Sequence, residues 1–245
     1  MRYLITFSYD GSKFQGYQKQ PKVRTVQGEL EKVLKTINVE KVEVEASGRT
    51  DAGVHALNQK AHFDLNISID PEKLKLALNS LLPGDIYVKN ALIVKDDFHA
   101  RFNAKAKEYV YKINMGEYDP IEKDYVYQYN KKLDIVAIER ALKYLEGEHD
   151  FKSFTKADDE KDNYVRKIVQ TNLTRDLKNV NHFSITFLGT GFMRYMVRNM
   201  VGTLIEIGEG KRKSEDIIDI INAKDRRKAG HTADPQGLYL KDVFY

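Results

Sequence analysis

The segment GRTDAGVHA, residues 48 to 56, gathers residue types that could do chemistry. Asp51 supplies a carboxylate, Arg49 a planar cation, and His55 an imidazole four residues after the aspartate. An aspartate close to a glycine commonly stabilises a turn through its own backbone. Gly48 suggests unusual backbone angles here, and the company of Arg49 favours a carboxylate that stays ionised. Such a carboxylate can act as a nucleophile or a base.

The histidine and the possibility of a metal site leave alternatives open. His55 could be a base or a ligand, although a packed or loop-stabilising histidine is the commoner case. A metal site of Asp51, His55 and His62 is conceivable, but its spacing matches no compact metal motif. The chain has no cysteine, which excludes disulfides, thiolate nucleophiles and thiolate zinc sites. We therefore expect oxygen or nitrogen chemistry and no metal.

Two tyrosines lie on one face of a predicted strand over residues 106 to 114. Core packing is the ordinary explanation, and we favour it for Tyr111. Lys105 and Lys107 lie just before Tyr109, which favours a stacking role for that ring. A bound base and its phosphates need both an aromatic plane and positive charge.

The segment HFSITFLGTGFMRYMVRNMVG predicts a strand, a Gly-x-Gly turn and a helix from about Phe192 to Ile207. It resembles a dinucleotide-binding fingerprint only superficially, because Arg194 occupies the position of the third glycine. On the predicted helix, Arg194 and Arg198 are four residues apart at the edge of an apolar face. They are either two exposed surface arginines or a pair whose guanidinium groups face a cleft.

The hydrophobic periodicity predicts elements that position these residues, in two α+β halves with a boundary near residue 100. A helical stripe begins after Thr25, which is expected as its N-cap. The acidic segment 156–163 is expected to be an exposed loop. The other predicted strands are 3–8, 41–46, 59–65, 85–94, 164–175 and 182–188, and the other predicted helices are 71–82 and 133–145.

Composition and charge narrow the class of protein. The chain has 245 residues, of which 42% are hydrophobic, and a net charge of +4. No run is long enough to span a bilayer, and the N-terminus lacks a signal-peptide core, so we expect a soluble cytoplasmic protein. Three basic clusters, at 19–24, 211–213 and 224–228, are either solvated surface or contacts for nucleic acid.

The motif around Asp51 resembles the signature of the TruA family of tRNA pseudouridine synthases. Further segments match this family in order along nearly the whole chain. One departure is Tyr17, where many members carry tryptophan. The matching segments are YDGSKFQGYQKQ, RTVQGELE, FHARFNAKAKEYVYKI, GEHDFKSFTK, MVRNMVGTLIEIGEGK and DPQGLYL.

The resemblance implies an α+β fold, the pseudouridine synthase fold. Two similar α/β halves would be joined through one extended, mainly antiparallel sheet with a central cleft. The N-terminal half, 1–100, would carry the catalytic aspartate loop, and the C-terminal half, 101–245, would complete the active-site cleft. The enzyme would act as a homodimer on the anticodon arm of tRNA, without a cofactor.

The resemblance also implies roles for single residues. The reaction would isomerise uridine to pseudouridine at positions 38, 39 and 40 of the tRNA, with Asp51 as the nucleophile on a flipped-out base. Tyr109 would stack on the target base, and Arg198 would pair with Asp51. Arg49, Lys107 and Arg101 would bind substrate. The alternatives from other classes are a non-catalytic RNA-binding protein and a metal-dependent hydrolase.

Overall fold

The chain forms two compact units, and their bounds differ from the predicted division into an N-terminal and a C-terminal half. The computed structural model describes residues 1–156 and 163–245, so most of the predicted loop at 156–163 lies outside the described residues. Unit 1 consists of residues 1–105 together with 239–245, and unit 2 of residues 106–238. The sequence-based division was 1–100 and 101–245. The structure therefore returns the C-terminal residues to the unit that contains the N-terminus.

Unit 1 is built on a mostly antiparallel sheet with the strand order β4-β1-β3-β10. β1 pairs antiparallel with β3 and β4, whereas β10 runs parallel to β3. The alternate residues Tyr3, Ile5 and Phe7 of β1 are fully buried, as expected for a strand with one face in a core. The strands are β1 (Arg2–Tyr9), β3 (His55–Asp64), β4 (Ile86–Ile93) and β10 (Leu238–Phe244), and the short β2 (Glu45–Ala46) pairs with β3.

Both helices of unit 1 have a side-chain N-cap, and the one at Thr25 was predicted. α1 (Val26–Asn38) begins after Thr25, whose side chain accepts a hydrogen bond from the Gly28 amide. α2 (Pro71–Leu81) begins after Asp70, and its first residue is a proline, which suits the first turn of a helix. The side chains of Leu30 and Leu34 on α1 are fully buried.

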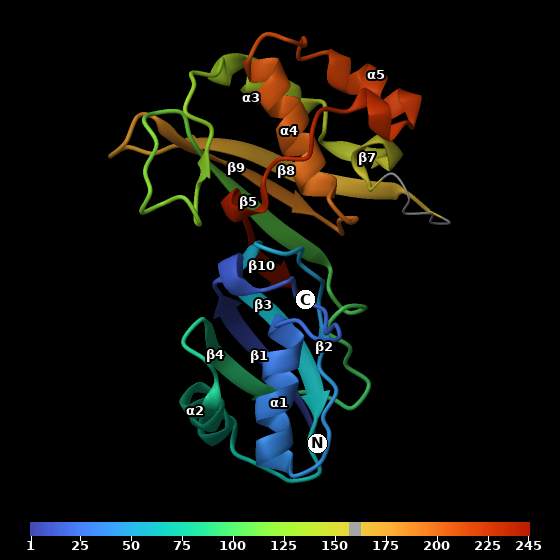
Figure 1. Cartoon of the computed structure of the whole chain (residues 1–245). Helices are drawn as coiled ribbons and strands as arrows, with labels where there is room; N and C mark the ends of the chain where they lie inside the picture. Colours follow the sequence, from blue (N-terminus) through green and yellow to red (C-terminus); the bar gives the residue numbers. More distant parts are fainter. Residues whose placement is uncertain (157–162) are drawn as a thin grey trace. The chain divides into compact units, whose positions relative to one another are not determined.

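In unit 2 the strands of the ten-stranded sheet pair antiparallel in the order β5-β9-β8-β7. β5 pairs with β9 from Lys107 opposite Gly189 to Asn114 opposite His182. Figure 1 shows the helices of unit 2 gathered over one face of these strands. The strands are β5 (Ala106–Asn114), β7 (Gly147–Asp150), β8 (Val165–Arg175) and β9 (His182–Gly189), with β6 (Tyr127–Gln128) beside β5; the helices are α3 (Ile135–Lys143), α4 (Met196–Gly208) and α5 (Asp216–Ala223).

The predicted α+β class is confirmed, and two predicted elements need correction. Of the strand expected at 41–46, only Glu45–Ala46 pairs with another strand. Val42 and Val44 bury alternate side chains, as a strand would, but they do not join the sheet. The helix expected from Phe192 begins at Met196, because Tyr195 has a left-handed backbone with φ 63°. Among the described residues, no helix is long and apolar enough to cross a membrane.

Candidate active site

The backbone on both sides of Asp51 is held by the segment that follows β1. The Tyr17 amide donates to the Thr50 carbonyl over 3.0 Å, and the Gly53 amide donates to the Phe14 carbonyl over 3.4 Å. Within the loop, the Val54 amide donates to the Asp51 carbonyl over 3.2 Å. The first two bonds join the loop to residues 33 and 39 positions earlier in the chain. These main-chain hydrogen bonds therefore fix the backbone position of Asp51, whose side chain is partly buried.

Close packing of glycines makes this contact possible. A Cβ atom on Gly11 would lie 2.0 Å from the Val54 carbonyl oxygen, and one on Gly16 would lie 3.1 Å from the Thr50 carbonyl oxygen. Gly16 and Gly53 have φ of 92° and 77°, which favour glycine. The special backbone angles expected at Gly48 occur instead at Gly53, since Gly48 has no positive φ.

Buried polar side chains support the loop from beneath. The hydroxyls of Tyr9 and Thr50 are 2.8 Å apart and share a hydrogen bond. Gln59 on β3 donates to the Gly48 carbonyl over 2.9 Å and accepts from the Ser47 hydroxyl over 2.7 Å. Burial raises the pKa of Tyr9 to about 12. Tyr9 is therefore a neutral hydrogen-bonding group at ordinary pH.

His55 has the packed, loop-stabilising geometry. It is the first residue of β3 and only 2% exposed. Its Nδ1 accepts a hydrogen bond from the Gly11 amide over 3.0 Å, and its ring stacks on Tyr239 with centroids 4.6 Å apart. A ring held on two sides in this way positions the chain beside Asp51. These contacts favour the structural role over a role as base or ligand.

The conceivable metal site of Asp51, His55 and His62 does not form. His55 and His62 stand seven residues apart on one strand, roughly 20 Å, which is too far for two ligands of one ion. The Nδ1 of His62 accepts from the Ala100 amide over 3.2 Å. Across residues 1–156 and 163–245, no three side chains of the metal-binding types are grouped to hold an ion.

Two predicted substrate-binding arginines of unit 1 are exposed. Arg49 lies two residues before Asp51 on the same loop. Arg101 follows β4, and its guanidinium carbon lies 5.7 Å from the centre of the Phe102 ring. Phe102 is itself 75% exposed, so it does not belong to the core. Only Arg49 shares the loop of the candidate nucleophile.

Tyr109 and Lys107 belong to unit 2, on β5. The Tyr109 ring is 8% exposed and meets the edge of Phe192, with centroids 5.1 Å apart and planes at 77°. Tyr111 is fully buried, and its hydroxyl donates to the Asp234 carbonyl over 2.7 Å. The core role expected for Tyr111 is therefore confirmed.

Arg198 is the third residue of α4 and is held at two points. Its Nε donates to the Ala233 carbonyl over 2.7 Å, while its own carbonyl accepts from the Ala233 amide over 3.1 Å. Arg194 precedes α4, so the helical spacing expected for the two arginines is wrong. The pair nevertheless meets at one ring, because each guanidinium carbon lies 5.1 Å from the centre of Tyr195. Asp51 and Arg198 lie in different units, and their pairing stays a prediction.

A buried polar group on α4 was missed by the sequence analysis. Asn199 is fully buried, donates to the Phe154 carbonyl over 2.7 Å, and accepts from Arg226 and Thr232. A Cβ on Gly202, one turn later, would lie 1.8 Å from the His231 carbonyl oxygen. An asparagine and a glycine inside an otherwise apolar helix were the available signal that another backbone segment approaches there.

The basic clusters are largely engaged in ion pairs. Arg24 binds Asp85 at 2.6 Å, Arg212 binds Glu206 at 2.6 Å, and Lys211 binds Glu209 at 2.7 Å. The Arg226 side chain donates to the Gly230 carbonyl over 2.9 Å, in addition to its bond to Asn199. Arg226 therefore supports the fold of the segment after α5, a role that its position in a basic cluster did not indicate.

Comparison with known proteins agrees with this assembly of motifs. A sequence profile described as tRNA pseudouridine synthase matches residues 5–103 and 141–245. The tRNA pseudouridine synthase A of Geobacillus sp. strain WCH70 is 48% identical, covering 100% of this chain and 98% of that protein. The enzymes of the same name from Caldicellulosiruptor bescii and Thermosipho africanus are 44% and 45% identical, covering 99% and 100% of this chain and 98% and 99% of their own lengths. This chain belongs to the tRNA pseudouridine synthase family and is an isomerase.

Proposed function

We propose that this protein isomerises uridine to pseudouridine at positions 38, 39 and 40 of the tRNA anticodon stem-loop, with Asp51 as the nucleophile. The observation that carries the proposal is the anchored loop: hydrogen bonds from residues 14–17 bracket Asp51 on both sides. An enzyme gains from such anchoring because a reacting group must be held close to its attack position.

The chemistry explains why one carboxylate is the central group. The N-glycosidic bond between N1 of uracil and C1′ of ribose breaks, the uracil turns, and a bond from C5 to C1′ forms. N1 gains a proton and C5 loses one, so the formula and the oxidation state are unchanged. The reaction balances without a metal, a redox cofactor or an energy source. It needs an anionic nucleophile and a site that retains the detached uracil.

The remaining residues take supporting roles in this proposal. Tyr109 stacks on the target base, with Phe192 against its ring to fix the plane. Arg198 pairs with the Asp51 carboxylate, which favours its ionised form. Arg49 helps to displace or replace the flipped uridine, and Lys107 and Arg101 bind the substrate. We further propose a cytoplasmic homodimer, because the family resemblance implies one.

The proposal is tested by mass spectrometry of tRNA incubated with the protein and then derivatised at pseudouridine with a carbodiimide. We expect derivatised sites at positions 38–40 with the wild type and none with Asp51→Asn. A chelator-treated sample should behave like the wild type. Tight tRNA binding without derivatised sites would support a non-catalytic RNA-binding protein instead. Full activity of Asp51→Asn would remove the nucleophile from the proposal and leave the family unaffected.

The role of Tyr109 has a separate test. Tyr109→Phe keeps the aromatic plane and loses only the hydroxyl, so a stacking role predicts a small loss of rate. Tyr109→Ala removes a contact that is worth about 1–3 kcal/mol per stacked base. Single-turnover rates of the two variants separate the cases, because equally severe losses would assign the role to the hydroxyl.

A further inference from the structure

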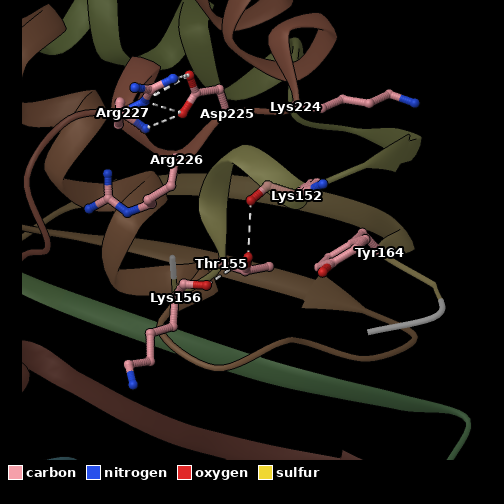
Figure 2. Close-up of a pocket in the computed structure, with 8 residues that line it drawn as sticks. All are labelled: Lys152, Thr155, Lys156, Tyr164, Lys224, Asp225, Arg226 and Arg227. Carbon is pink, nitrogen blue, oxygen red and sulfur yellow. Dashed lines mark hydrogen bonds and ion pairs between the residues drawn. The ribbon is translucent and has the colours of Figure 1, made fainter. Parts of the chain in front are cut away.

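A cavity lined mainly by charged side chains lies in unit 2, outside the residues assigned above to the reaction. It has a volume of about 280 Å³ and lies where the 3-10 turns Lys152–Phe154 and Arg226–Lys228 come together near the start of β8. Five cationic side chains and a single carboxylate line it, so its charge is strongly positive. Its lining residues are Lys152, Thr155, Lys156, Tyr164, Lys224, Asp225, Arg226 and Arg227 (Figure 2).

The carboxylate that lines this cavity, Asp225, already forms an ion pair with Arg227. Asp225 accepts from Arg227 Nε and from its terminal nitrogen at 3.0 and 2.8 Å, as the dashed lines in Figure 2 show. These bonds hold the pKa of Asp225 at about 2, so it is ionised and paired under ordinary conditions. A metal ion is a poor occupant, because one paired carboxylate among cations is not a ligand set.

The cations differ in how they are engaged. Lys224 lies 3.0 Å from the Asp150 carboxylate, and Arg226 bonds to main-chain carbonyls and to Asn199. Lys152 and Lys156 form no ion pair with any carboxylate of the described residues. Lys152 Nζ instead lies 5.4 Å from the centre of the Tyr164 ring. These two lysines are the cations of the cavity that a bound anion would neutralise.

Hydrogen bonds hold the main chain of the two turns that form the cavity. The buried Ser153 hydroxyl donates to the Ile220 carbonyl and accepts from the Asp225 amide over 2.9 Å, which links the two turns. Asn199 joins the same turns to α4, through the Phe154 carbonyl on one side and Arg226 on the other. The main chain that carries the positive side chains is therefore ordered before any ligand arrives, which reduces the entropy lost on binding.

We propose that this cavity is a phosphate subsite that binds a phosphodiester of the tRNA backbone. Its volume lies just below the range of about 300–1,000 Å³ that is typical of pockets for drug-sized ligands, which is compatible with a small anionic group such as one phosphate. Its single aromatic ring already faces Lys152, which disfavours a stacked base. Phosphate contacts of this kind fix the register of an RNA without reading its sequence. The proposal rests on tRNA being the substrate of this family.

The test replaces Lys152 and Lys156, which have no ion pair with a described residue, and measures tRNA affinity at several salt concentrations. The variant Lys152→Gln/Lys156→Gln should raise Kd about tenfold at low salt and lower the slope of log K against log salt by about 1.4–1.8, the value for two contacts. The control Lys131→Gln/Lys132→Gln removes the same charge from two exposed residues outside the cavity. It should leave both quantities close to the wild type.

Two outcomes would overturn the subsite. One is a Kd and a salt slope equal to those of the control, which would reduce the lysines to general surface charge. The other comes from a parallel titration of wild type and variant with polyglutamate, a model of an acidic protein. Loss of polyglutamate binding in the variant with tRNA affinity unchanged would assign the cavity to an acidic protein partner. Failure of the proposed reaction is seen separately: the wild type would then form no pseudouridine at positions 38–40, whatever the variant does to affinity.

Discussion

The Asp51 loop and the cationic cavity of unit 2 are built by opposite means. The loop is positioned by main-chain hydrogen bonds and by glycines packed against its backbone, with a Cβ on Gly11 only 2.0 Å from Val54. The cavity presents long side chains from a pinned main chain, and Lys152 is exposed. The loop fixes the backbone position of one carboxylate, whereas the cavity provides several positive charges on long side chains.

The difference matches the two proposed tasks. The reaction rate falls steeply when a nucleophile is displaced by about 1 Å. A positive charge attracts a phosphate over several ångströms and needs no such precision. We therefore expect changes in the loop to alter the turnover rate through shape. Changes in the cavity should alter affinity through charge.

The largest expected effect is on the rate, from Gly11→Ala. The added methyl group would collide with the Val54 carbonyl and push the loop that carries Asp51. We expect about a hundredfold lower rate at saturating tRNA, the loss associated with a displacement of about 1 Å. Gly84→Ala is the matched control, because no atom lies within 4 Å of its Cβ position. Rapid-quench turnover with a thermal melt separates displacement from unfolding, and a wild-type rate in Gly11→Ala would contradict the rigid-loop interpretation.

The buried tyrosine under the loop should make stability sensitive to alkali. The pKa of Tyr9 is raised by burial to about 12 from an ordinary value of 10. Its contribution is fully present below pH 10 and is lost as pH rises from about 10 to 12, because only the unfolded chain releases the proton easily. We expect about 2 kcal/mol less unfolding free energy from this group at about pH 11.5.

Urea unfolding at pH 9 and at pH 11.5 measures this loss in the wild type and in Tyr9→Phe, with the exposed Tyr87→Phe as control. The decline should be smaller in Tyr9→Phe than in the other two proteins. An equal decline in all three would show that Tyr9 is not the group responsible.

Removing the Tyr9 hydroxyl and removing the Tyr17 hydroxyl should have different effects on the unfolding free energy at neutral pH. The Tyr9 hydroxyl is hydrogen-bonded to Thr50, whereas the Tyr17 hydroxyl is buried without a partner among the described residues. Tyr9→Phe should lower the unfolding free energy by about 1 kcal/mol, and Tyr17→Phe should leave it unchanged or raise it. Denaturant titration of both variants decides this. A clear loss in Tyr17→Phe would mean that its hydroxyl has a partner.

The smallest effect should come from Lys152→Arg in the cavity. The charge is retained while the shape of the head group changes. We expect tRNA affinity within about twofold of the wild type and an unchanged salt slope. Fluorescence titration with tRNA measures both. A tenfold loss would show that the cavity recognises shape, and would remove the contrast with the Asp51 loop.

Several elements could be predicted because their signals are local. The strand over 106–114 was predicted with the bounds that the structure has, since Tyr109, Tyr111 and Ile113 recur at every second position. The N-cap at Thr25 follows from a hydroxyl in front of an apolar helical stripe. The start of α4 could not be predicted, because the left-handed Tyr195 lies inside a continuous apolar pattern.

The candidate site was predictable only in part. The motif around Asp51 was found from its residue types, and its family follows from that motif together with the others. The partners of the loop were not found, because Tyr9, Gly11 and Gly16 lie far earlier in the chain. Nor did the basic clusters reveal that Arg24 and Arg226 hold internal partners, since an ion pair depends on distance in space.

The sequence by itself determined the candidate nucleophile, the α+β class and most of the helices and strands, because these depend on residue type and short-range periodicity. Only the tertiary structure decided that β10 returns to run beside β3 and that His55 is a packing residue. It also decided which lysines line a cavity without an ion pair to the described residues. Such features depend on contacts between distant segments, and one sequence does not record which segments will meet.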